Sequence, residues 1–413
     1  MMTGQGTLRP AGLILAVVLL FGVAGLVCST LDSVRFKAGA DEGFYLAYAS
    51  RVSIEGPAAF PRLFADYLCG SEVTRYFPNP LRILTISLGA IALKLGGGVY
   101  FANLALLSLA AFLAVLVLMF VGTGRAFGWR TAGWTLLLAC AAPLHLAMAR
   151  RALSDTLVSA FLLGGLWLFL RAIWKDEGER PPLRWLWVAL SFAAAFLVKE
   201  STFLLVPVAL FFLGWRWFRS GRPEGLGPFL AVALFPAMLA GTLVVLAAGG
   251  IEPALYVARS FSGAAALNAY AIKYQNGPWF RFIVDFLLIS PWPVLLTLVW
   301  IGTLIGSRVR DERAWFWALI PVLFIAMISF VPAGKNIRLM TFLEMPMRLC
   351  SVLLLQRITG DSEGNLRSTA LMAAAIGCIL WMDLQAFWGM FVLGGIYDPV
   401  SAMLLRARGF FPL

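Results

Sequence analysis

Long apolar runs recur along this chain, and they constrain its fold more than any other feature. The run from Ala231 to Ala248 has no charged residue, and Thr242 is its only polar side chain. A bilayer core about 30 Å thick needs roughly 20 apolar residues for each helical span. Backbone groups find no water there, so such a run forms a helix or belongs to a closed barrel. Barrel strands alternate apolar and polar residues, and this run does not, so we predict an all-α, polytopic membrane protein.

The composition and the spacing of the runs indicate how many spans there are. Of the 413 residues, 61% are hydrophobic and 13% are charged, whereas a soluble domain carries about 25% charged residues. The first run follows Arg9 and is interpreted as an uncleaved span, because it exceeds a signal-peptide core and no Ala-x-Ala-like site follows. About eleven spans are predicted, at residues 11–31, 100–121, 131–149, 153–173, 184–198, 201–218, 227–249, 283–306, 314–333, 339–357 and 369–392.

The connections between spans predict an orientation. Those at 174–183, 217–226 and 307–313 are short and rich in arginine, and the positive-inside rule places such loops in the cytoplasm. The opposite side carries slightly more Lys and Arg in total, much of it in the long segment 32–99, which the rule partly discounts. We therefore expect the N-terminus inside and, after an odd number of spans, the C-terminus outside.

Two substantial segments, 32–99 and 250–282, fall on the predicted outer side. The first is interleaved with aromatic residues, and residues 42–54 have an apolar face at helical spacing with a charged rim. Such a stretch suits a helix that lies in the membrane interface rather than crossing it. The chain is thus predicted to be one membrane domain over residues 1–413, with interfacial helices and no separate soluble C-terminal domain.

Charge and cysteine content argue against nucleic-acid binding and against a metal framework. The net charge is +12, but the basic residues are scattered at the ends of the predicted spans, which favours contact with anionic membrane lipids. Of the five cysteines, only Cys69 falls in a predicted aqueous loop, and no two share a metal-ligand spacing. Neither a zinc site nor a disulfide framework is predicted.

Ionisable residues gather at a few places on the predicted outer side. Inside a membrane such a residue costs about 2.5–3.5 kcal/mol and marks a functional site by default; near a span end, snorkelling lowers that cost. The residues are Asp41 and Glu42 after the first span, Arg150, Arg151 and Asp155 at the fourth, Lys199 and Glu200 between the fifth and sixth, and Lys335 and Arg338 before the tenth.

These residue types suit transfer of a sugar from a polyprenyl phosphate. The departing phosphate or diphosphate is an anion, which fixed Lys and Arg side chains stabilise without a metal. The attacking acceptor hydroxyl needs a carboxylate within hydrogen-bond reach to accept its proton. Because the donor's tail stays in lipid while the acceptor arrives from water, the reaction belongs at the interface, where these residues are predicted to lie.

Four short motifs follow one another in a recognisable order. They are Gly39–Tyr45 (GADEGFY), Phe77–Leu81 (FPNPL), Ala149–Asp155 (ARRALSD) and Ala195–Pro207, with Lys199-Glu200 at its tip; Lys335–Leu339 followed by Pro346 is a weaker fifth. Over residues 11–350 this order resembles the membrane-embedded GT-C glycosyltransferases, particularly the branch of protein O-mannosyltransferases and bacterial lipid A aminoarabinose transferases. Asn79 departs from that branch, since the commoner pattern there is Pro-Pro-Leu.

The resemblance implies roles for individual residues. It implies that Asp41 is the catalytic base, that Glu42 orients Asp41 or the acceptor, and that Asp155 is a secondary acidic residue. It also implies a direct displacement with inversion at the sugar, commonly without a divalent metal or other cofactor. The residues implied to hold the lipid phosphate are Arg150, Arg151, Lys199, Lys335 and Arg338.

The resemblance extends to the reactants and the location. The donor is expected to be a polyprenyl-phosphate-linked sugar, and the acceptor a hydroxyl of a lipid, glycan or protein. The expected site of reaction is the periplasmic or exterior face of a bacterial inner membrane.

Each of these residues also has a purely structural interpretation. Asp41 is a residue type that caps helices, and Asp155 is spaced to pair with Arg151 at i, i+4. Lys199-Glu200 can simply mark a hairpin tip, and basic residues at span ends commonly anchor to lipid headgroups. His145, the only histidine, is predicted to be packed or hydrogen-bonded, and Asp383 in the last span has no assigned role.

Other functions are kept as alternatives. A transporter or lipid flippase predicts internal repeats and broken helices at mid-membrane, and the sequence has no convincing repeat. An O-antigen ligase or polymerase usually has its large outer loop late in the chain, whereas here the longest outer segment follows the first span. A degenerate member that acts only as a scaffold is the third alternative, which the intact acidic residues argue against.

Overall fold

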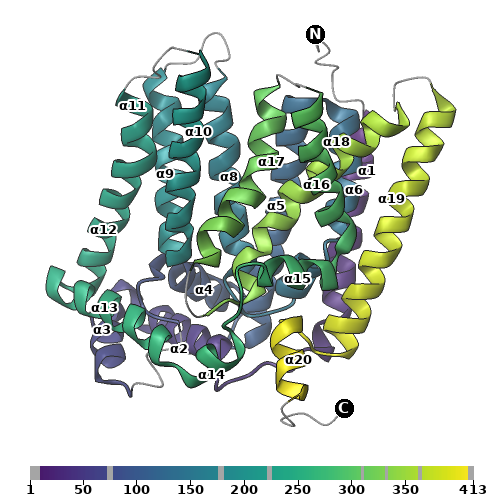
Figure 1. The fold of residues 1–413 in the computed structure, drawn as a ribbon. Helices are drawn as coiled ribbons and strands as arrows, with labels where there is room; N and C mark the ends of the chain where they lie inside the picture. The colour runs from purple at the N-terminus through teal and green to yellow at the C-terminus, as the bar shows by residue number, and fades with distance from the viewer. Residues whose placement is uncertain are drawn as a thin grey trace.

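A computed structural model describes residues 10–71, 78–174, 181–220, 226–307, 311–330, 334–360 and 365–407. Within those ranges the regular structure is helical throughout, and no strand occurs. The helices form a bundle with a layer of short helices across one end (Figure 1). Phe77 and parts of the three short arginine-rich connections lie outside the described residues.

Among the described residues, eight helical segments are long and apolar enough to cross a membrane. Their main helices are α1 (Pro10–Ser29), α5 (Phe101–Phe127), α8 (Asp155–Ile173), α10 (Leu205–Ser220), α12 (Phe235–Ala248), α17 (Glu312–Ser329), α18 (Glu344–Thr359) and α19 (Leu366–Ala386). Some continue into short 3-10 or π turns, among them η4 (Glu200–Leu204), η5 (Leu230–Leu234), η6 (Ile337–Leu343) and η7 (Phe387–Leu393). The chain is therefore an integral, multi-pass membrane protein.

Two predicted spans are interrupted, and proline explains both interruptions. The segment predicted at 131–149 is α6 (Trp129–Cys140) and α7 (Pro143–Ala149), which meet at 61°. The prediction of one continuous helix at 283–306 was wrong. There α15 (Arg281–Ile289) ends before Ser290, and α16 begins at Pro291 and ends at Gly306. Proline has no N–H and disfavours helical geometry in the residue before it, so each helix stops there.

The number of spans remains a prediction. The eight full-length segments, the bent pair, α9 (Pro181–Val198) and α16 coincide with the eleven predicted segments. The apolar stretches of α9 and α16 are, however, shorter than those of the eight full-length segments. α4 (Ile83–Leu95) is also short and apolar and lies within the long segment 32–99. It packs beside α2 (Asp41–Glu55), the helix expected in residues 42–54.

The layer of short helices lies at the lower end of Figure 1 and is called the platform end here. It contains α2, α3 (Phe60–Cys69), α13 (Ile251–Leu267), α14 (Ala269–Tyr274), α15 and α20 (Pro399–Ala407). α1 begins at the opposite end of the bundle and α20 lies at the platform end (Figure 1). The two long predicted segments, 32–99 and 250–282, thus contribute to the same face.

Close approach of the central helices holds the platform end in place. α8 packs against both α5 and α9. A Cβ added at Gly165 would come within 2.7 Å of the Phe192 ring, and one at Gly122 within 2.3 Å of Trp167. Small residues let helix backbones approach closely in membranes, where van der Waals packing drives association. The start of α8, which carries Asp155, is therefore held by a tightly packed core.

Candidate active site

Asp41 is the first residue of α2 and faces a cation from a distant part of the chain. Ala40 precedes the helix in an extended conformation, and no side chain caps this end, so the capping interpretation of Asp41 does not hold. Acidic residues in the first turn still favour the helix, because they face the positive end of its dipole. The Asp41 carboxylate accepts a hydrogen bond of 3.0 Å from Arg338, and 31% of its side chain is exposed.

Glu42 is buried and anchors the start of α2. Its carboxylate accepts two hydrogen bonds of 2.6 Å from the Arg151 guanidinium, and further bonds from the backbone N–H groups of Ala152 and Lys37. Only 1% of its side chain is exposed. The ring of Tyr397 covers the Arg151 guanidinium at 4.4 Å. Glu42 therefore fixes the start of the helix that carries Asp41. Its predicted role in orienting Asp41 or the acceptor stays a prediction.

Asp155 pairs with Lys199 rather than with Arg151. The Lys199 ammonium donates to the Asp155 carboxylate at 2.7 Å, and both side chains are buried. The i, i+4 interpretation fails because residues 151–154 precede α8 and are not helical, so Arg151 and Asp155 do not share a helix face. The structure thus joins the start of α8 to the turn after α9.

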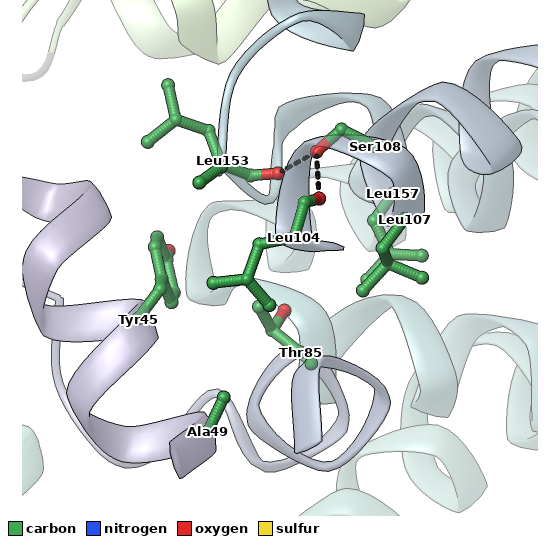
Figure 2. Close-up of a pocket in the computed structure, with 10 residues that line it drawn as sticks. Tyr45, Ala49, Thr85, Leu104, Leu107, Ser108, Leu153 and Leu157 are labelled. Carbon is green, nitrogen blue, oxygen red and sulfur yellow. Dashed lines mark hydrogen bonds between the residues drawn. The ribbon is translucent and has the colours of Figure 1, made fainter. Parts of the chain in front are cut away.

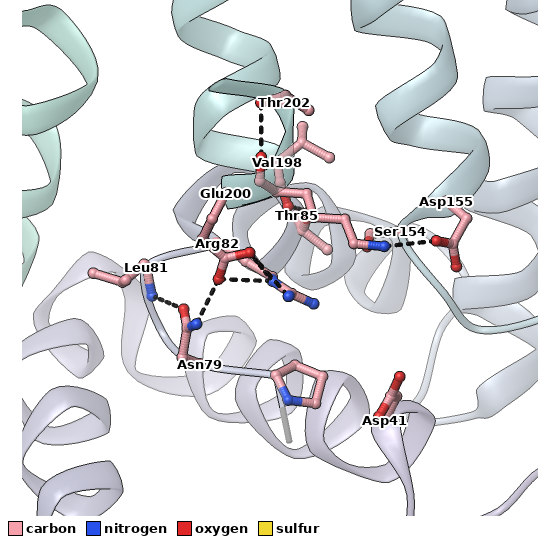
Figure 3. A network of polar contacts seen from close by, with 12 residues as sticks. Asp41, Asn79, Leu81, Arg82, Thr85, Ser154, Asp155, Val198, Glu200 and Thr202 are labelled. Atoms are coloured by element: carbon pink, nitrogen blue, oxygen red, sulfur yellow. Dashed lines mark hydrogen bonds and ion pairs between the residues drawn. The ribbon is translucent and has the colours of Figure 1, made fainter. Parts of the chain in front are cut away.

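The hairpin tip also holds an arginine that the sequence motifs did not single out. Arg82 donates from Nε to both Glu200 carboxylate oxygens, at 3.1 and 3.0 Å, and also contacts the Tyr45 hydroxyl. Asn79 donates to the same Glu200 carboxylate and accepts from the Leu81 N–H. Asn79, the departure from the family's Pro-Pro-Leu pattern, is therefore a buried part of the network shown in Figure 3.

Tyr45 joins the network from the face of α2 that also carries Asp41. Its hydroxyl lies 3.0 Å from the Ser154 hydroxyl, one residue before Asp155. Burial raises the pKa of the Tyr45 phenol, and the charge of Arg82 opposes that rise. Two signals were available in the sequence: Tyr45 follows Asp41 at i+4, on one helix face, and Arg82 directly follows the FPNPL motif.

Three cations and two carboxylates converge at the platform end. The cations are Arg82, Lys199 and Arg338, and the carboxylates are Asp41 and Asp155. In Figure 3 the Arg82 guanidinium points towards the region that Asp41 and Asp155 also face. Burial lowers the pKa of the Lys199 ammonium; Asp155 opposes this, and the positive charges of Arg82 and Arg338 add to it. We call these five residues the acid–base cluster.

Two of the predicted phosphate-binding residues are engaged elsewhere. Arg150 is fully buried, donates to the Thr30 carbonyl at 2.7 Å, and contacts Ser33. Lys335 is buried too, and its ammonium donates to the Gly277 carbonyl at 2.7 Å. Both hold backbone segments at the platform end. Their predicted contact with a lipid phosphate is untested.

A small pocket opens beside Tyr45 (Figure 2), whose hydroxyl contacts Arg82 of the acid–base cluster. Its empty volume, which includes the open mouth, is about 330 Å³. Tyr45 and Ala49 of α2 line one side, and the other sides come from α4, α5 and the start of α8. Apart from Tyr45, its lining residues are Ala49, Thr85, Gly89, Leu104, Leu107, Ser108, Ala152, Leu153 and Leu157. The pocket is mostly apolar.

The described residues include no group of three or more His, Cys, Asp and Glu side chains placed to hold a metal ion. The carboxylates of the site are instead paired with arginine and lysine. Metal independence of the reaction remains a prediction.

Comparisons with known proteins agree with the helical architecture. Residues 87–244 match the family model described as dolichyl-phosphate-mannose-protein mannosyltransferase. No curated protein sequence matches the chain.

Several solved structures share the fold. Oligosaccharyltransferase from Archaeoglobus fulgidus in the apo form aligns with a TM-score of 0.63 at 11% identity, covering 91% of this chain and 55% of that one. ArnT from Cupriavidus metallidurans bound to undecaprenyl phosphate aligns with a TM-score of 0.60 at 14% identity, covering 97% and 79%. The archaeal oligosaccharyltransferase AglB from A. fulgidus, in complex with an inhibitory peptide and a dolichol-phosphate, aligns at 0.60 and 11%, covering 94% and 56%.

At these identities the structural matches establish the fold. The chain spans little more than half the length of the oligosaccharyltransferases it matches. The GT-C resemblance inferred from the order of the motifs is confirmed.

Proposed function

We propose, on the premise that this chain is a member of the GT-C superfamily by fold and family match, that it transfers a sugar from a polyprenyl-phosphate donor. The observation that carries the proposal is the acid–base cluster, in which three cations from separate segments meet two carboxylates beside an apolar pocket. The acceptor is a hydroxyl group of a lipid, glycan or protein. The reaction takes place on the outer face of the membrane.

Asp41 is the general base because it is the more exposed of the two carboxylates in the acid–base cluster. Glu42 and Asp155 are 1% and 3% exposed, and their oxygens are bound by Arg151 and Lys199, whereas Asp41 is 31% exposed. The acceptor oxygen attacks the anomeric carbon and its proton passes to the Asp41 carboxylate. The bond from the anomeric carbon to the phosphate oxygen breaks, and the phosphate keeps the electron pair. A direct displacement of this kind inverts the anomeric centre.

Arg82, Lys199 and Arg338 stabilise the charge that develops on the departing phosphate. Arginine stays protonated in proteins, and fixed cations in a water-poor site stabilise a developing anion without reorganising. Arg82 is held by Glu200 and Tyr45, so its guanidinium is oriented before the donor binds. Three other basic residues support the frame of the site: Arg150 donates from Nη2 to Thr30, Arg151 donates to Glu42, and Lys335 donates to Gly277.

The lipid part of the donor suits the apolar surroundings of the cluster. Tyr45 belongs both to the polar network and to the wall of the pocket. The similar ArnT structure is bound to undecaprenyl phosphate, and the similar AglB structure contains a dolichol-phosphate. Both ligands are long isoprenoid phosphates, which supports a donor of this chemical class.

The bent pair α6–α7 gives little support to the transporter alternative. A transporter uses the exposed ends of broken helices to bind its substrate. Here the first N–H groups of α7 donate to the Glu344 carboxylate, so this break is occupied by the protein itself.

The direct test is Asp41→Asn in sugar transfer by the purified protein, with candidate lipid-linked donors supplied in membranes. Loss of a general base costs typically 10²–10⁴-fold, so transfer should fall by about that factor while expression and membrane insertion stay normal. Asp66→Asn is the matched control, because Asp66 is an exposed, arginine-paired carboxylate on the neighbouring α3. Normal transfer by Asp41→Asn would remove Asp41 from the mechanism.

The face of the membrane is tested separately. Lys37 is exposed close to Asp41, and Ser307 is exposed at the opposite end of the bundle. In a background lacking the exposed Cys28, Cys69 and Cys378, Lys37→Cys should react with a membrane-impermeant thiol reagent in intact cells. Ser307→Cys should react only after the membrane is opened. The reverse pattern would overturn the proposed orientation.

A further inference from the structure

A buried carboxylate, Glu344, lies outside the acid–base cluster at the start of α18. It is 2% exposed and accepts hydrogen bonds from the backbone N–H groups of Leu144 and His145, at 3.2 and 2.8 Å. The His145 ring nitrogen Nδ1 lies 2.8 Å from the same carboxylate, so His145 is packed and hydrogen-bonded, as predicted. Three contacts from one short segment therefore converge on this single acid.

The position of Glu344 follows from the break between α6 and α7. The first N–H groups of a helix have no partner within the helix, and here Pro143 starts α7 inside the protein. A carboxylate at this end satisfies the N–H groups and faces the positive end of the helix dipole. Glu344 supplies from another helix the cap that α7 lacks locally, since Ala142 has no side-chain cap.

Two further charged residues, Arg348 and Asp383, lie near Glu344 in the interior of the bundle. Arg348, one turn along α18, lies 3.7 Å from the Glu344 carboxylate and 2.9 Å from Asp383 of α19. Asp383 accepts a hydrogen bond of 2.6 Å from Ser290. Asp383, for which the sequence suggested no role, thus belongs to a buried polar network with Arg348 and Ser290.

Two arms lead from Glu344 to Asp41. The first runs along α7 to Arg151, which binds Glu42, the neighbour of Asp41 in the first turn of α2. The second runs through η6, which ends immediately before Glu344 and carries Arg338, the cation bound to Asp41. Together, the two arms form a closed ring of contacts. Glu344 lies where the arms meet on one side of the ring, and Asp41, the proposed base, lies where they meet on the other.

We infer that Glu344 is a positioning residue that sets the alignment of Asp41 with Arg338, an inference that rests on the proposed function of Asp41. Its carboxylate touches α7 and His145 but no residue of the acid–base cluster. Without it, α7 loses the acceptor for its first N–H groups. Arg151 and Arg338 are then no longer held in register, although both remain present.

The inference is tested first by Glu344→Gln, with a readout that does not depend on sugar transfer. Hydrogen exchange of the α2 amides at residues 41–46 should become faster than in the unmodified protein. Transfer should fall by up to about 100-fold, the scale of a 1 Å misplacement of catalytic groups. Glu312→Gln is the control, because Glu312 is an arginine-paired carboxylate at the opposite end of the bundle. Unchanged exchange at α2 would overturn the inference.

A double-mutant cycle of Glu344→Gln with Arg338→Lys separates positioning from general stability. Residues that act through one another give non-additive effects, while independent sites add. Sugar transfer by the double variant should therefore be close to that of the less active of the two single variants. Losses that multiply would overturn the inference. If α2 exchange responds to Glu344→Gln but Asp41→Asn keeps normal transfer, the ring of contacts stands and the proposed function of Asp41 fails.

His145 provides a milder pair of variants in case Glu344→Gln does not fold. His145→Asn keeps a nitrogen donor near the position of Nδ1, whereas His145→Leu removes it and leaves the two backbone bonds to Glu344. Exchange at α2 and transfer should be near normal in His145→Asn. In His145→Leu, exchange should be faster and transfer lower. Equal behaviour of the two variants would contradict the inference.

Discussion

The two ends of the helix bundle carry similar basic residues but use them differently. At the platform end, Arg151 and Lys199 are 11% and 10% exposed, and each binds a carboxylate from a distant segment that is at most 3% exposed. At the opposite end, Arg216 binds Glu312, and the two side chains are 19% and 25% exposed. Desolvation makes an ion pair costly to break, whereas water screens an exposed pair. Burial therefore distinguishes the pairs of Glu42 with Arg151 and of Asp155 with Lys199, which hold the frame of the site, from the Arg216–Glu312 pair. The Asp41–Arg338 pair is itself partly exposed.

Lys199→Met is expected to have the largest effect of these variants, because it leaves the Asp155 carboxylate buried without its ion-pair partner. Removing one member of a buried ion pair typically costs about 3–5 kcal/mol, and we expect a loss of that size in the free energy of unfolding. Thermal unfolding in detergent or nanodiscs measures it. Adding Asp155→Asn should restore much of the loss, because the unpaired charge is then gone. A Lys199→Met variant as stable as the unmodified protein would contradict the comparison.

Arg82→Lys tests the platform end more finely, because it keeps the positive charge of the side chain and changes the geometry of its hydrogen-bond donors. Lysine lacks the planar fork with which Arg82 binds Glu200 and Tyr45. Hydrogen bonds to charged groups contribute about 1.5–3 kcal/mol, so kcat/KM for the lipid-linked donor should fall about 10- to 100-fold. Arg51→Lys, at the exposed pair with Asp66, is the control and should have little effect. Equal responses of the two variants would refute the special role of Arg82.

Asp285 extends the comparison to pH. Its carboxylate lies 3.7 Å from Arg281 and accepts from the Val400 N–H, which ties α15 to α20. Burial, with the charge of Asp398 adding to it, raises the pKa of Asp285 to about 7 from 3.8. The folded state then binds the proton more tightly, so stability should fall as the pH rises from about 4 to about 7 and level off above.

Asp285→Asn should remove this part of the pH dependence of Tm, a change of a few degrees between pH 5 and pH 8. Asp311→Asn is the matched control, because Asp311 is exposed and asparagine can keep its N-cap bond to Arg313. A pH profile that stays the same in Asp285→Asn would show that another group controls it.

Arg216→Gln tests the opposite end, where the smallest response is expected. Surface ion pairs contribute about 0–1 kcal/mol, so Tm should change little and sugar transfer should stay normal. A marked loss of transfer would mean that the opposite end is coupled to the reaction, and the contrast between the two ends would fail.

Several properties of this protein can be read from local sequence. Apolar runs of sufficient length predict membrane helices because a backbone in hydrocarbon must bond to itself. Prolines such as Pro143 and Pro291 mark where those runs break. The order of the motifs, from the acidic pair Asp41-Glu42 onwards, predicted the GT-C resemblance that the family match and the shared fold together support.

The partners of the charged residues depend on the tertiary structure. Arg151 binds Glu42 rather than the nearby Asp155, and Arg82 and Tyr45 enter the site beside residues more than a hundred positions away in the chain. Glu344 lies in an apolar span with nothing in its local pattern to connect it to Asp41. A local pattern specifies which face of a helix avoids lipid, because hydrophobicity acts residue by residue. Which charge meets which depends on how distant helices pack, and at the platform end that packing brings Asp41, Asp155 and three cations together.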